Sequence, residues 1–169
     1  MPSVYIREES KADRAAIRQV TEIAFRNKPY TDGDEQDVID RLRSSHALAL
    51  SLVAVENDEI LGQITFSPAI VEDDSKSWFA LGPVSVTPSR QGEGIGSSLI
   101  KQGLAGIDSL GALGCILTGN PEYYKKFGFK LAPKNSPINE SELYFQLKLL
   151  GGELPEGRFA FHRAFYEGG

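Results

Sequence analysis

The sequence contains few of the residues that build disulfides and metal centres. Its 169 residues include one cysteine, Cys115, and two histidines. An intramolecular disulfide is therefore impossible, and no cysteine–histidine metal site is expected. No apolar run reaches the roughly 20 residues that span a bilayer, and the N-terminus lacks the basic and then apolar pattern of a signal peptide. We expect a cytoplasmic protein with no metal and no membrane partner.

An excess of positive charge is also missing. The chain has 18 Lys and Arg against 23 Asp and Glu, a formal net charge of −5, which argues against nucleic acid as a partner. Such a balance tolerates or attracts a small cationic substrate. The hydrophobic fraction of 41% is ordinary for a globular protein. Because no linker or internal repeat interrupts the pattern, we expect a single domain over residues 1–169.

Apolar residues recur at strand spacing in some segments and at helix spacing in others. Strands are predicted over residues 4–7, 47–56, 60–71, 78–86, 114–118, 129–131, 143–149 and 158–161. Helices are predicted over about four turns that include Ile17 to Ala24, over 35–44, from Ile95 to near Gly111, and over 122–126. Gly82-Pro83 interrupts the strand over 78–86 and indicates a bulge or a separation from its neighbour. The helix after Ile95 predicts a crossover, with parallel strands on either side.

Three glycines follow the strand over 78–86, which ends before Pro88. Gly92, Gly94 and Gly96 permit a tight turn, and the free N–H groups of the helix that starts near Ile95 suit a phosphate or pyrophosphate. A dinucleotide fingerprint fails, because its third glycine would fall at a serine or a leucine, and no Gly-Lys-Ser/Thr of a P-loop follows. From these residues alone, the segment is either an anion site or a plain strand-to-helix turn.

The same segment matches a more specific pattern. Gln91-Gly92-Glu93-Gly94-Ile95-Gly96 resembles the Q/R-x-x-G-x-G/A signature of the GCN5-related N-acetyltransferase (GNAT) superfamily, and the segment 123–129, Tyr-Tyr-Lys-Lys-Phe-Gly-Phe, resembles its final conserved segment. Leu81-Gly82-Pro83-Val84 with Gly119-Asn120-Pro121 further resembles the YhbS-type branch, in which aspartate is the more frequent residue at position 120. The resemblance implies an α/β fold, α+β in some schemes. Its mixed, mostly antiparallel sheet would be flanked by helices and would open between two parallel strands.

The resemblance also implies acetyl-CoA as the co-substrate. The loop backbone would bind the pyrophosphate, and the exposed edge of the interrupted strand would hold the pantetheine arm as an added strand would. One strand N–H would hold the thioester oxygen as charge develops on it. The residues assigned to the cofactor are Val84, Ser85, Val86, Gln91, Gly92, Glu93, Gly94, Ile95, Gly96, Ser97, Asn120 and Tyr124.

Two residues are the candidates for proton transfer. A phenol keeps its proton at neutral pH, so Tyr124 is the candidate general acid for the departing thiolate. Glu35, at the start of a helix, is the preferred candidate general base, with Glu72 or Asp73 as alternatives. Each carboxylate equally fits a solvated surface group. The acceptor would be a primary amine on a small molecule or a peptide, and it would attack the thioester directly.

Other functions stay open at this point. The chain would also fit a non-catalytic acyl-CoA-binding module, or a regulatory domain whose glycine loop binds a different phosphate ligand. A homodimer through the C-terminal strands is a further possibility, although nothing specific in the sequence supports it. Cys115 lies in an apolar strand and fits a core residue better than a nucleophile.

Overall fold

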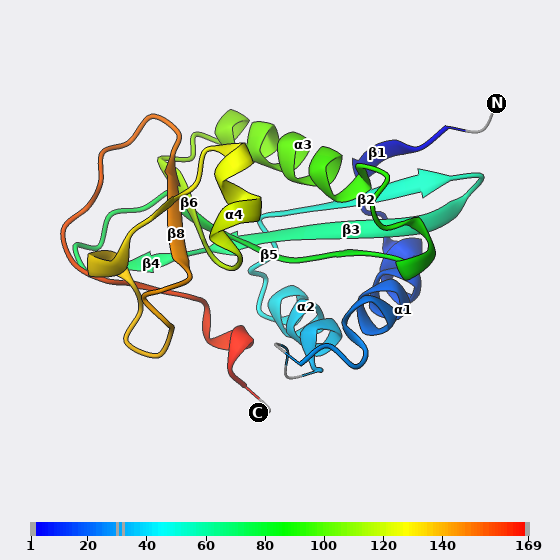
Figure 1. The fold of residues 1–169 in the computed structure, drawn as a ribbon, viewed down its shortest axis with the longest axis horizontal. Helices are drawn as coiled ribbons and strands as arrows, with labels where there is room; N and C mark the ends of the chain where they lie inside the picture. The colour runs from blue at the N-terminus through cyan, green and yellow to red at the C-terminus, as the bar shows by residue number, and fades with distance from the viewer. Residues whose placement is uncertain (1–2, 30, 32, 168–169) are drawn as a thin grey trace.

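A seven-stranded sheet with helices on both faces forms the body of the protein (Figure 1). The structure is a computed structural model that describes residues 3–29, 31 and 33–167. The strands are β1 Tyr5–Glu8, β2 Leu50–Glu56, β3 Glu59–Pro68, β4 Ile70–Val71, β5 Trp78–Val86, β6 Gly114–Thr118, β7 Lys130–Leu131, β8 Phe145–Leu149 and β9 Phe159–Ala160. The helices are α1 Arg14–Phe25, α2 Glu35–Ser44, α3 Ile95–Ser109 and α4 Pro121–Tyr124. Short 3-10 turns cover Lys11–Asp13, Pro88–Arg90, Lys125–Phe127, Pro133–Asn135 and Arg163–Phe165.

The strand order in the large sheet is β1-β2-β3-β5-β6-β8-β7. Among the strand pairs of this sheet that the structure describes, β5 and β6 are parallel and the others are antiparallel. This is the mixed, mostly antiparallel sheet that the resemblance implied, and α3 is the predicted crossover between the parallel pair. The residues that the structure describes contain no helix long and apolar enough to cross a membrane.

One predicted strand was too long. The segment 60–71 was expected to be a single strand, but β3 ends at Pro68, and β4 leaves the large sheet to pair with β9 in a second, two-stranded sheet. The apolar pattern continues through this corner because Ala69 and Val71 stay buried, together with Trp78 and Phe159, in a separate apolar cluster. Burial therefore persists where the pairing partner changes.

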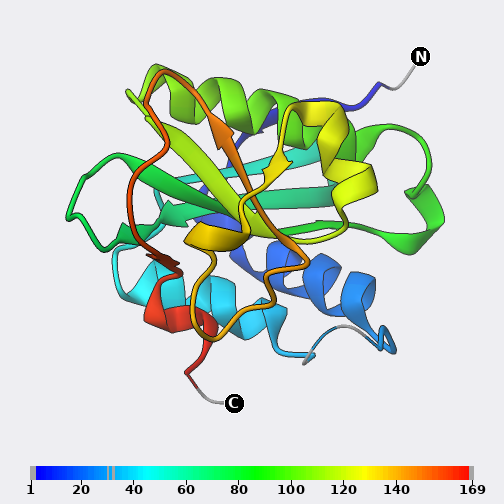
Figure 2. The ribbon, with the colours of Figure 1, turned by 60° about the vertical axis from the view of Figure 1, so that its left-hand side comes forward.

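Two helical layers sandwich the sheet. In Figures 1 and 2, α3 covers one face, and α1 and α2 cover the other. Alternate residues of β2 face opposite layers, as strand geometry requires. Val53 and Val55 pack with Ile17 of α1 and Ile39 of α2, whereas β2 residues of the other parity join the cluster beneath α3.

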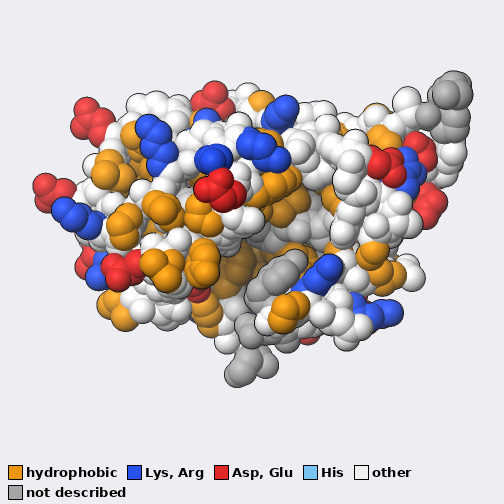
Figure 3. Space-filling model, viewed as in Figure 1, with side chains coloured by type: hydrophobic (Ala, Val, Ile, Leu, Met, Phe, Trp, Pro, Cys, Tyr) orange, Lys and Arg blue, Asp and Glu red, His pale blue; other side chains and the backbone are white. Residues whose placement is uncertain are grey.

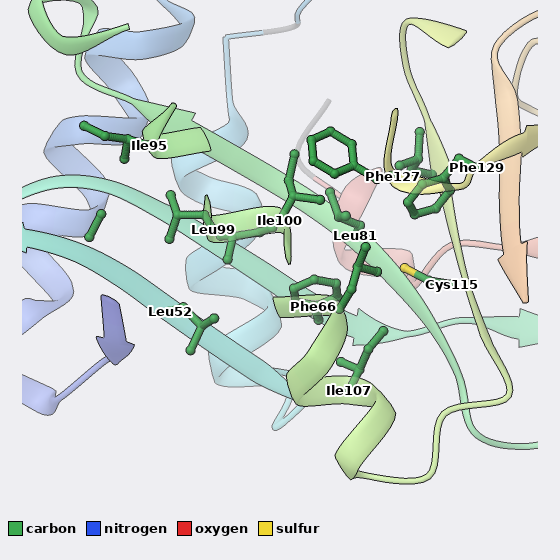
Figure 4. Packing of buried hydrophobic residues seen from close by; sticks show 14 of the residues in the cluster. Leu52, Phe66, Leu81, Ile95, Leu99, Ile100, Ile107, Cys115, Phe127 and Phe129 are labelled. Carbon is green, nitrogen blue, oxygen red and sulfur yellow. The ribbon is translucent and has the colours of Figure 1, made fainter. Parts of the chain in front are cut away.

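The α3 face holds the largest apolar cluster. Leu99, Ile100 and Ile107 of α3 are almost completely buried, as is Phe66 of β3 (Figure 4). Gly103 allows the close approach of the helix, because a Cβ at this position would overlap the Phe66 ring. This packing fixes α3, and therefore its N-terminal loop, relative to the central strands.

The parallel pairing of β5 and β6 is short. Its register covers three residue pairs, the last of which joins Ala80 to Ile116. Beyond Ala80, β5 continues beside β3, whereas β6 pairs with β8 on its other side. Gly82-Pro83, joined by a cis peptide bond, lies just past the last pair. The two strands therefore diverge at the place where the sequence predicted an opening.

Candidate active site

The open edge of β5 forms one side of the site. Thr87 N–H donates to the Leu61 carbonyl of β3 at 2.8 Å, so the backbone groups of Ser85, two residues earlier, also face β3. Because polar backbone groups alternate along a strand, those of Val84 and Val86 point to the opposite side, into the opening. Val86 O there accepts a hydrogen bond from the Gln91 side chain at 2.9 Å.

A buried polar cluster holds this part of β5 in place. Gln63 Nε2 of β3 donates to Pro83 O at 3.2 Å and to Ser85 Oγ at 2.8 Å. Ser85 Oγ in turn lies 3.2 Å from Thr21 Oγ1 of α1, and Thr65 donates to Gln63 Oε1 at 2.9 Å. Ser85 therefore connects α1 to the sheet through its side chain, while it also borders the opening.

The glycine loop links β5 to α3 and lies at the wider end of the opening. Gly92 and Gly94 have φ values of +84° and +88°, a region that favours glycine because side chains clash there. Gly94 is the N-terminal cap of α3, and its carbonyl accepts the first helical bond, from Ser98 N–H at 3.0 Å. The helix N–H groups that precede Ser98 have no acceptor within the helix and are therefore available to an anion.

A cavity of about 460 Å³, here called the loop cavity, lies against this loop. Its lining includes Val84, Ser85, Val86, Gln91, Gly92, Gly94, Ile95, Gly96 and Ser97, all of which the sequence assigned to the cofactor. The charged residues among its described lining are Lys28, Arg90 and Lys126, all cationic. Glu93, also assigned to the cofactor, is not part of this lining, and its carboxylate pairs with Arg90 at 3.0 Å.

A second cavity, here called the cleft cavity, occupies the divergence between β5 and β6. It measures about 880 Å³ and shares Phe25, Val84 and Tyr123 with the loop cavity. Its lining brings Glu35 of α2 together with Tyr124 of α4 and with Asn120. The fold therefore gathers the candidate acid, the candidate base and the open strand edge around one space.

Tyr124 is held by aromatic neighbours. Its ring lies 5.0 Å from the Tyr123 ring and 6.0 Å from the Phe129 ring, both in edge-to-face geometry. Gly119 makes room for it, since a Cβ there would lie 2.7 Å from Tyr124 Cε2. Gly128, with φ of +93°, ends the turn after α4 and returns the chain so that Phe129 packs behind the tyrosine.

Asn120 has a clear local function. Its Oδ1 accepts a hydrogen bond from Glu122 N–H at 3.0 Å, so it is the N-terminal cap of α4. Aspartate caps helices equally well, so asparagine preserves the start of the helix that carries Tyr124. The expected short helix over 122–126 begins one residue earlier and becomes a 3-10 turn after Tyr124.

The two alternative bases lie elsewhere. Glu72 accepts a hydrogen bond from the backbone N–H of Arg158. Asp73 accepts from the backbone and the hydroxyl of Ser75, and these bonds lower the pKa of its carboxyl. Neither residue is part of the described lining of the loop cavity or the cleft cavity, so Glu35 is the only one of the three proposed bases that borders the opening.

Cys115 is completely buried in β6, and burial raises the pKa of its thiol above the usual range. A thiol of this kind is a poor nucleophile, in agreement with its assignment as a core residue. Within the described ranges of the chain, no group of three or more histidine, cysteine, aspartate or glutamate residues is arranged to hold a metal ion.

Several lining residues escaped the sequence analysis. Phe25 at the end of α1 and Tyr144 before β8 border the cleft cavity, and Lys28 borders the loop cavity. They come from segments far from both motifs, so no local pattern could have placed them there. Lys126 lies inside the second motif, where its charge was a usable signal; its Nζ lies 4.3 Å from the centre of the Tyr123 ring.

An open parallel pair beside a glycine loop at a helix N-terminus fits the acyl-CoA-dependent transferase class that the resemblance implied, and comparison with known proteins agrees. Residues 48–131 match the model of the acetyltransferase (GNAT) domain. A GNAT family acetyltransferase from Brucella melitensis, solved in complex with acetyl-CoA, is 47% identical, with a TM-score of 0.87 over 96% of this chain and 98% of that one. This chain belongs to the GNAT acetyltransferase family.

The YhbS branch is also represented among the relatives. The structure of Escherichia coli YhbS in complex with CoA has a TM-score of 0.90 and 25% identity, over 100% of this chain and 95% of that one. In sequence, the uncharacterised N-acetyltransferase YhbS is 28% identical over 110 residues, 64% of this chain. The uncharacterised E. coli N-acetyltransferase YjhQ is 32% identical over 124 residues, 71% of this chain. Each of these sequence matches spans 66% of the relative's length.

Proposed function

We propose that the protein transfers an acetyl group from acetyl-CoA to a primary amine. The observation that carries this proposal is the end of β5–β6 pairing at Ala80 and Ile116. It leaves the backbone of Val84 and Val86 facing the loop cavity, and Val84 also borders the cleft cavity, which Tyr124 lines. A long ligand matches these surfaces if its polyanionic end binds at the glycine loop and the amide groups along its arm pair with the open edge of β5. The relatives solved with acetyl-CoA and CoA support this choice of ligand.

The cationic loop cavity would hold the phosphates of the cofactor. The N–H groups at the start of α3 and the side chains of Lys28 and Lys126 supply donors and positive charge there. The pantetheine amides would pair with Val84 and Val86, so that the arm replaces the missing neighbour of β5. Glu93 would act only through Arg90, which it holds by an ion pair.

Transfer would then occur in the cleft cavity by direct attack. The amine nitrogen forms a bond to the thioester carbonyl carbon, and the carbon–sulfur bond breaks as the tetrahedral intermediate collapses. A strand N–H at the open edge of β5 stabilises the developing oxyanion. Glu35, directly or through water, takes the proton that the amine loses, and Tyr124 gives a proton to the leaving thiolate. Asn120 would contribute by starting the helix that positions Tyr124.

The cofactor half of the proposal can be tested by titration calorimetry with acetyl-CoA. We expect the wild-type chain to bind it, and Gly94→Val to weaken binding at least tenfold because valine strains the loop at a positive φ. Gly111→Val is a matched control, since Gly111 has φ of +87° but lies at the far end of α3. Absence of binding to the wild-type chain would overturn the proposal.

A binding module without chemistry is the second candidate, because it would share every cofactor contact. Release of free coenzyme A in the presence of an amine separates the two. Release that requires both an amine and Tyr124 supports the transferase, whereas tight binding without release across a panel of amines supports the module. A single domain over residues 1–169, a cytoplasmic location and a homodimer through the C-terminal strands remain predictions.

A further inference from the structure

A third cavity, here called the aromatic cavity, extends from the cleft cavity away from the glycine loop. It measures about 270 Å³ and shares with the cleft cavity Phe25, Glu35, Leu81, Gly82, Pro83 and Thr118. The face in Figure 3 is hollowed near its middle, with hydrophobic side chains beside the hollow. An acceptor that reaches the thioester in the cleft cavity can therefore extend into the aromatic cavity.

The walls of the aromatic cavity combine polar and apolar side chains, and the apolar ones include two neighbouring aromatic rings. Phe161 and Phe165 come from the C-terminal segment, with ring centres 5.6 Å apart, and Val38 comes from α2. Phe161 and Val38 are buried, and Phe165 is half-buried. An apolar group that enters this space would leave water and contact aromatic surface, which favours binding.

The charges along the three cavities are segregated by sign. Among the lining residues that the structure describes, the aromatic cavity has three charged side chains, Asp34, Glu35 and Glu140, all of them carboxylates. The charged lining of the loop cavity is entirely cationic. An anionic cofactor at one end and a cationic acceptor at the other end would match this arrangement.

The three carboxylates do not occupy equivalent places. Asp34 pairs with Arg41 at 3.0 Å, and Glu140 accepts a hydrogen bond from the Tyr166 hydroxyl at 2.8 Å. Both line the aromatic cavity only, whereas Glu35 lines the cleft cavity as well. Glu35 therefore lies at the boundary between the cleft cavity and the aromatic cavity. An acceptor whose ammonium group binds at Glu35 would extend its remaining atoms into the aromatic cavity.

The volume of the aromatic cavity indicates the size of the group that it can hold. A cavity of about 150 Å³ holds one benzene molecule, so 270 Å³ accommodates one aromatic ring and a short side chain. Asp34 and Glu140 already have partners in Arg41 and Tyr166. A second ammonium group of a polyamine would therefore lie mainly against the rings of Phe161 and Phe165, where burial of a charge is costly. We propose, on the basis of the function proposed above, that the acceptor is a primary amine on one compact, uncharged apolar group, aromatic or branched aliphatic.

The test compares three acceptors in a coenzyme A release assay: 2-phenylethylamine, spermidine and a lysine-containing peptide. We expect the highest kcat/KM for 2-phenylethylamine. Phe165→Ala should raise KM for this amine at least tenfold, with kcat changed less than threefold, because the ring contacts the apolar group and not the reacting atoms. Tyr5→Ala is the control, since Tyr5 is an exposed aromatic residue of β1 on none of the three cavities.

The outcomes separate this inference from the proposed function. If the chain binds acetyl-CoA and acetylates spermidine or the peptide better than 2-phenylethylamine, the inference fails and the transferase function stands. If acetyl-CoA binds and 2-phenylethylamine is not acetylated, the inference also fails. If acetyl-CoA does not bind, the proposed function itself fails. Thermal unfolding of Phe165→Ala checks that it is folded, and Phe165→Leu, with a smaller expected rise in KM, replaces it if it is not.

Discussion

At the scale of single residues, Asp13 connects β1 to the start of the first helical layer. Its carboxylate accepts two hydrogen bonds from the Arg7 guanidinium, at 2.7 and 3.1 Å, and one from Ser10 N–H at 2.6 Å. The bond to Arg7 is the main cause that lowers the pKa of Asp13 from 3.8 to about 2. Asp13 therefore stabilises the folded state in its ionised form, and this contribution depends on pH.

We predict that Asp13→Asn lowers the free energy of unfolding by about 1–2 kcal/mol at pH 7, a value reduced for screening because Arg7 is partly exposed. A carboxylate with a lowered folded-state pKa stabilises the protein above its unfolded pKa, and this stabilisation is lost as pH falls through the folded pKa. The difference between wild type and variant should therefore shrink between pH 4 and pH 2. Urea unfolding at several pH values measures it, and a pH-independent difference would contradict the ionic explanation.

Tyr124 is the residue on which the proposed chemistry depends most directly. Tyr124→Phe removes the hydroxyl and keeps the ring contacts with Tyr123 and Phe129. We expect kcat to fall about 100-fold or more, as loss of a general acid does, with the dissociation constant of acetyl-CoA changed less than threefold. Steady-state kinetics and calorimetry measure the two quantities. An unchanged kcat, with chemistry shown to be rate-limiting, would exclude Tyr124 as the acid.

At the scale of elements, the contact between α3 and the sheet depends on two glycines of unequal importance. A Cβ on Gly103 would overlap the ring of Phe66, which has no exposed surface. A Cβ on Gly106 would lie 2.6 Å from Cδ2 of Leu50, the end of a flexible, half-buried side chain. A larger side chain should therefore be tolerated far better at Gly106 than at Gly103.

We predict that Gly103→Ala destabilises the protein by about 1–3 kcal/mol through overpacking, despite the roughly 1 kcal/mol that alanine gains over glycine in a helix. The matched change Gly106→Ala should have an effect within about 1 kcal/mol of zero, since Leu50 can change rotamer. Urea unfolding of both variants provides the comparison. Equal destabilisation by the two would show that the approach to Phe66 is not the tight contact of this layer.

A second prediction at the scale of elements concerns the open edge of β5. Acetyl-CoA that pairs with β5 should slow amide hydrogen exchange at Val84 and Val86, whose N–H groups face the opening. Exchange at Ser85 and Thr87 should change much less, because their N–H groups face β3, as the bond from Thr87 to Leu61 shows. Exchange measured by NMR with and without acetyl-CoA tests this alternation. Equal slowing at all four residues would indicate general stabilisation and not strand-like pairing.

At the scale of the whole molecule, the local sequence pattern predicted the bounds of helices and strands better than it predicted which of them pack or pair together. The bounds of β5, β6 and α2 agree with the predicted 78–86, 114–118 and 35–44, because each has a single apolar face or a fully buried run between clear breakers. The end of β3 was missed, because burial continues past Pro68 into a different sheet. Periodicity reports burial and not the identity of the partner strand.

In the candidate site, too, the residues of continuous motifs could be predicted, and the residues brought together by tertiary packing could not. The glycine loop and the segment around Tyr124 are continuous in sequence, so their motifs could be recognised without a structure. Phe25, Phe161, Phe165 and Glu140 meet only because α1 and the C-terminal segment pack against the same opening. Nothing in the local sequence of these residues indicates a wall of a cavity, and tertiary packing alone brings them together.

The origin of the cavity walls has a consequence for how the protein can diversify. The glycine loop, the open edge of β5 and Tyr124 all lie within residues 48–131, which match the family domain. Glu35 and Val38 precede that range, and Glu140, Phe161 and Phe165 follow it. Under the two proposals above, cofactor binding is encoded mainly within the family domain. Acceptor preference is encoded in part outside it, because Leu81 to Pro83 and Thr118 of the domain also border the aromatic cavity. Substitution, insertion or exchange of the flanking segments can retune selectivity while the donor half of the machinery is inherited unchanged.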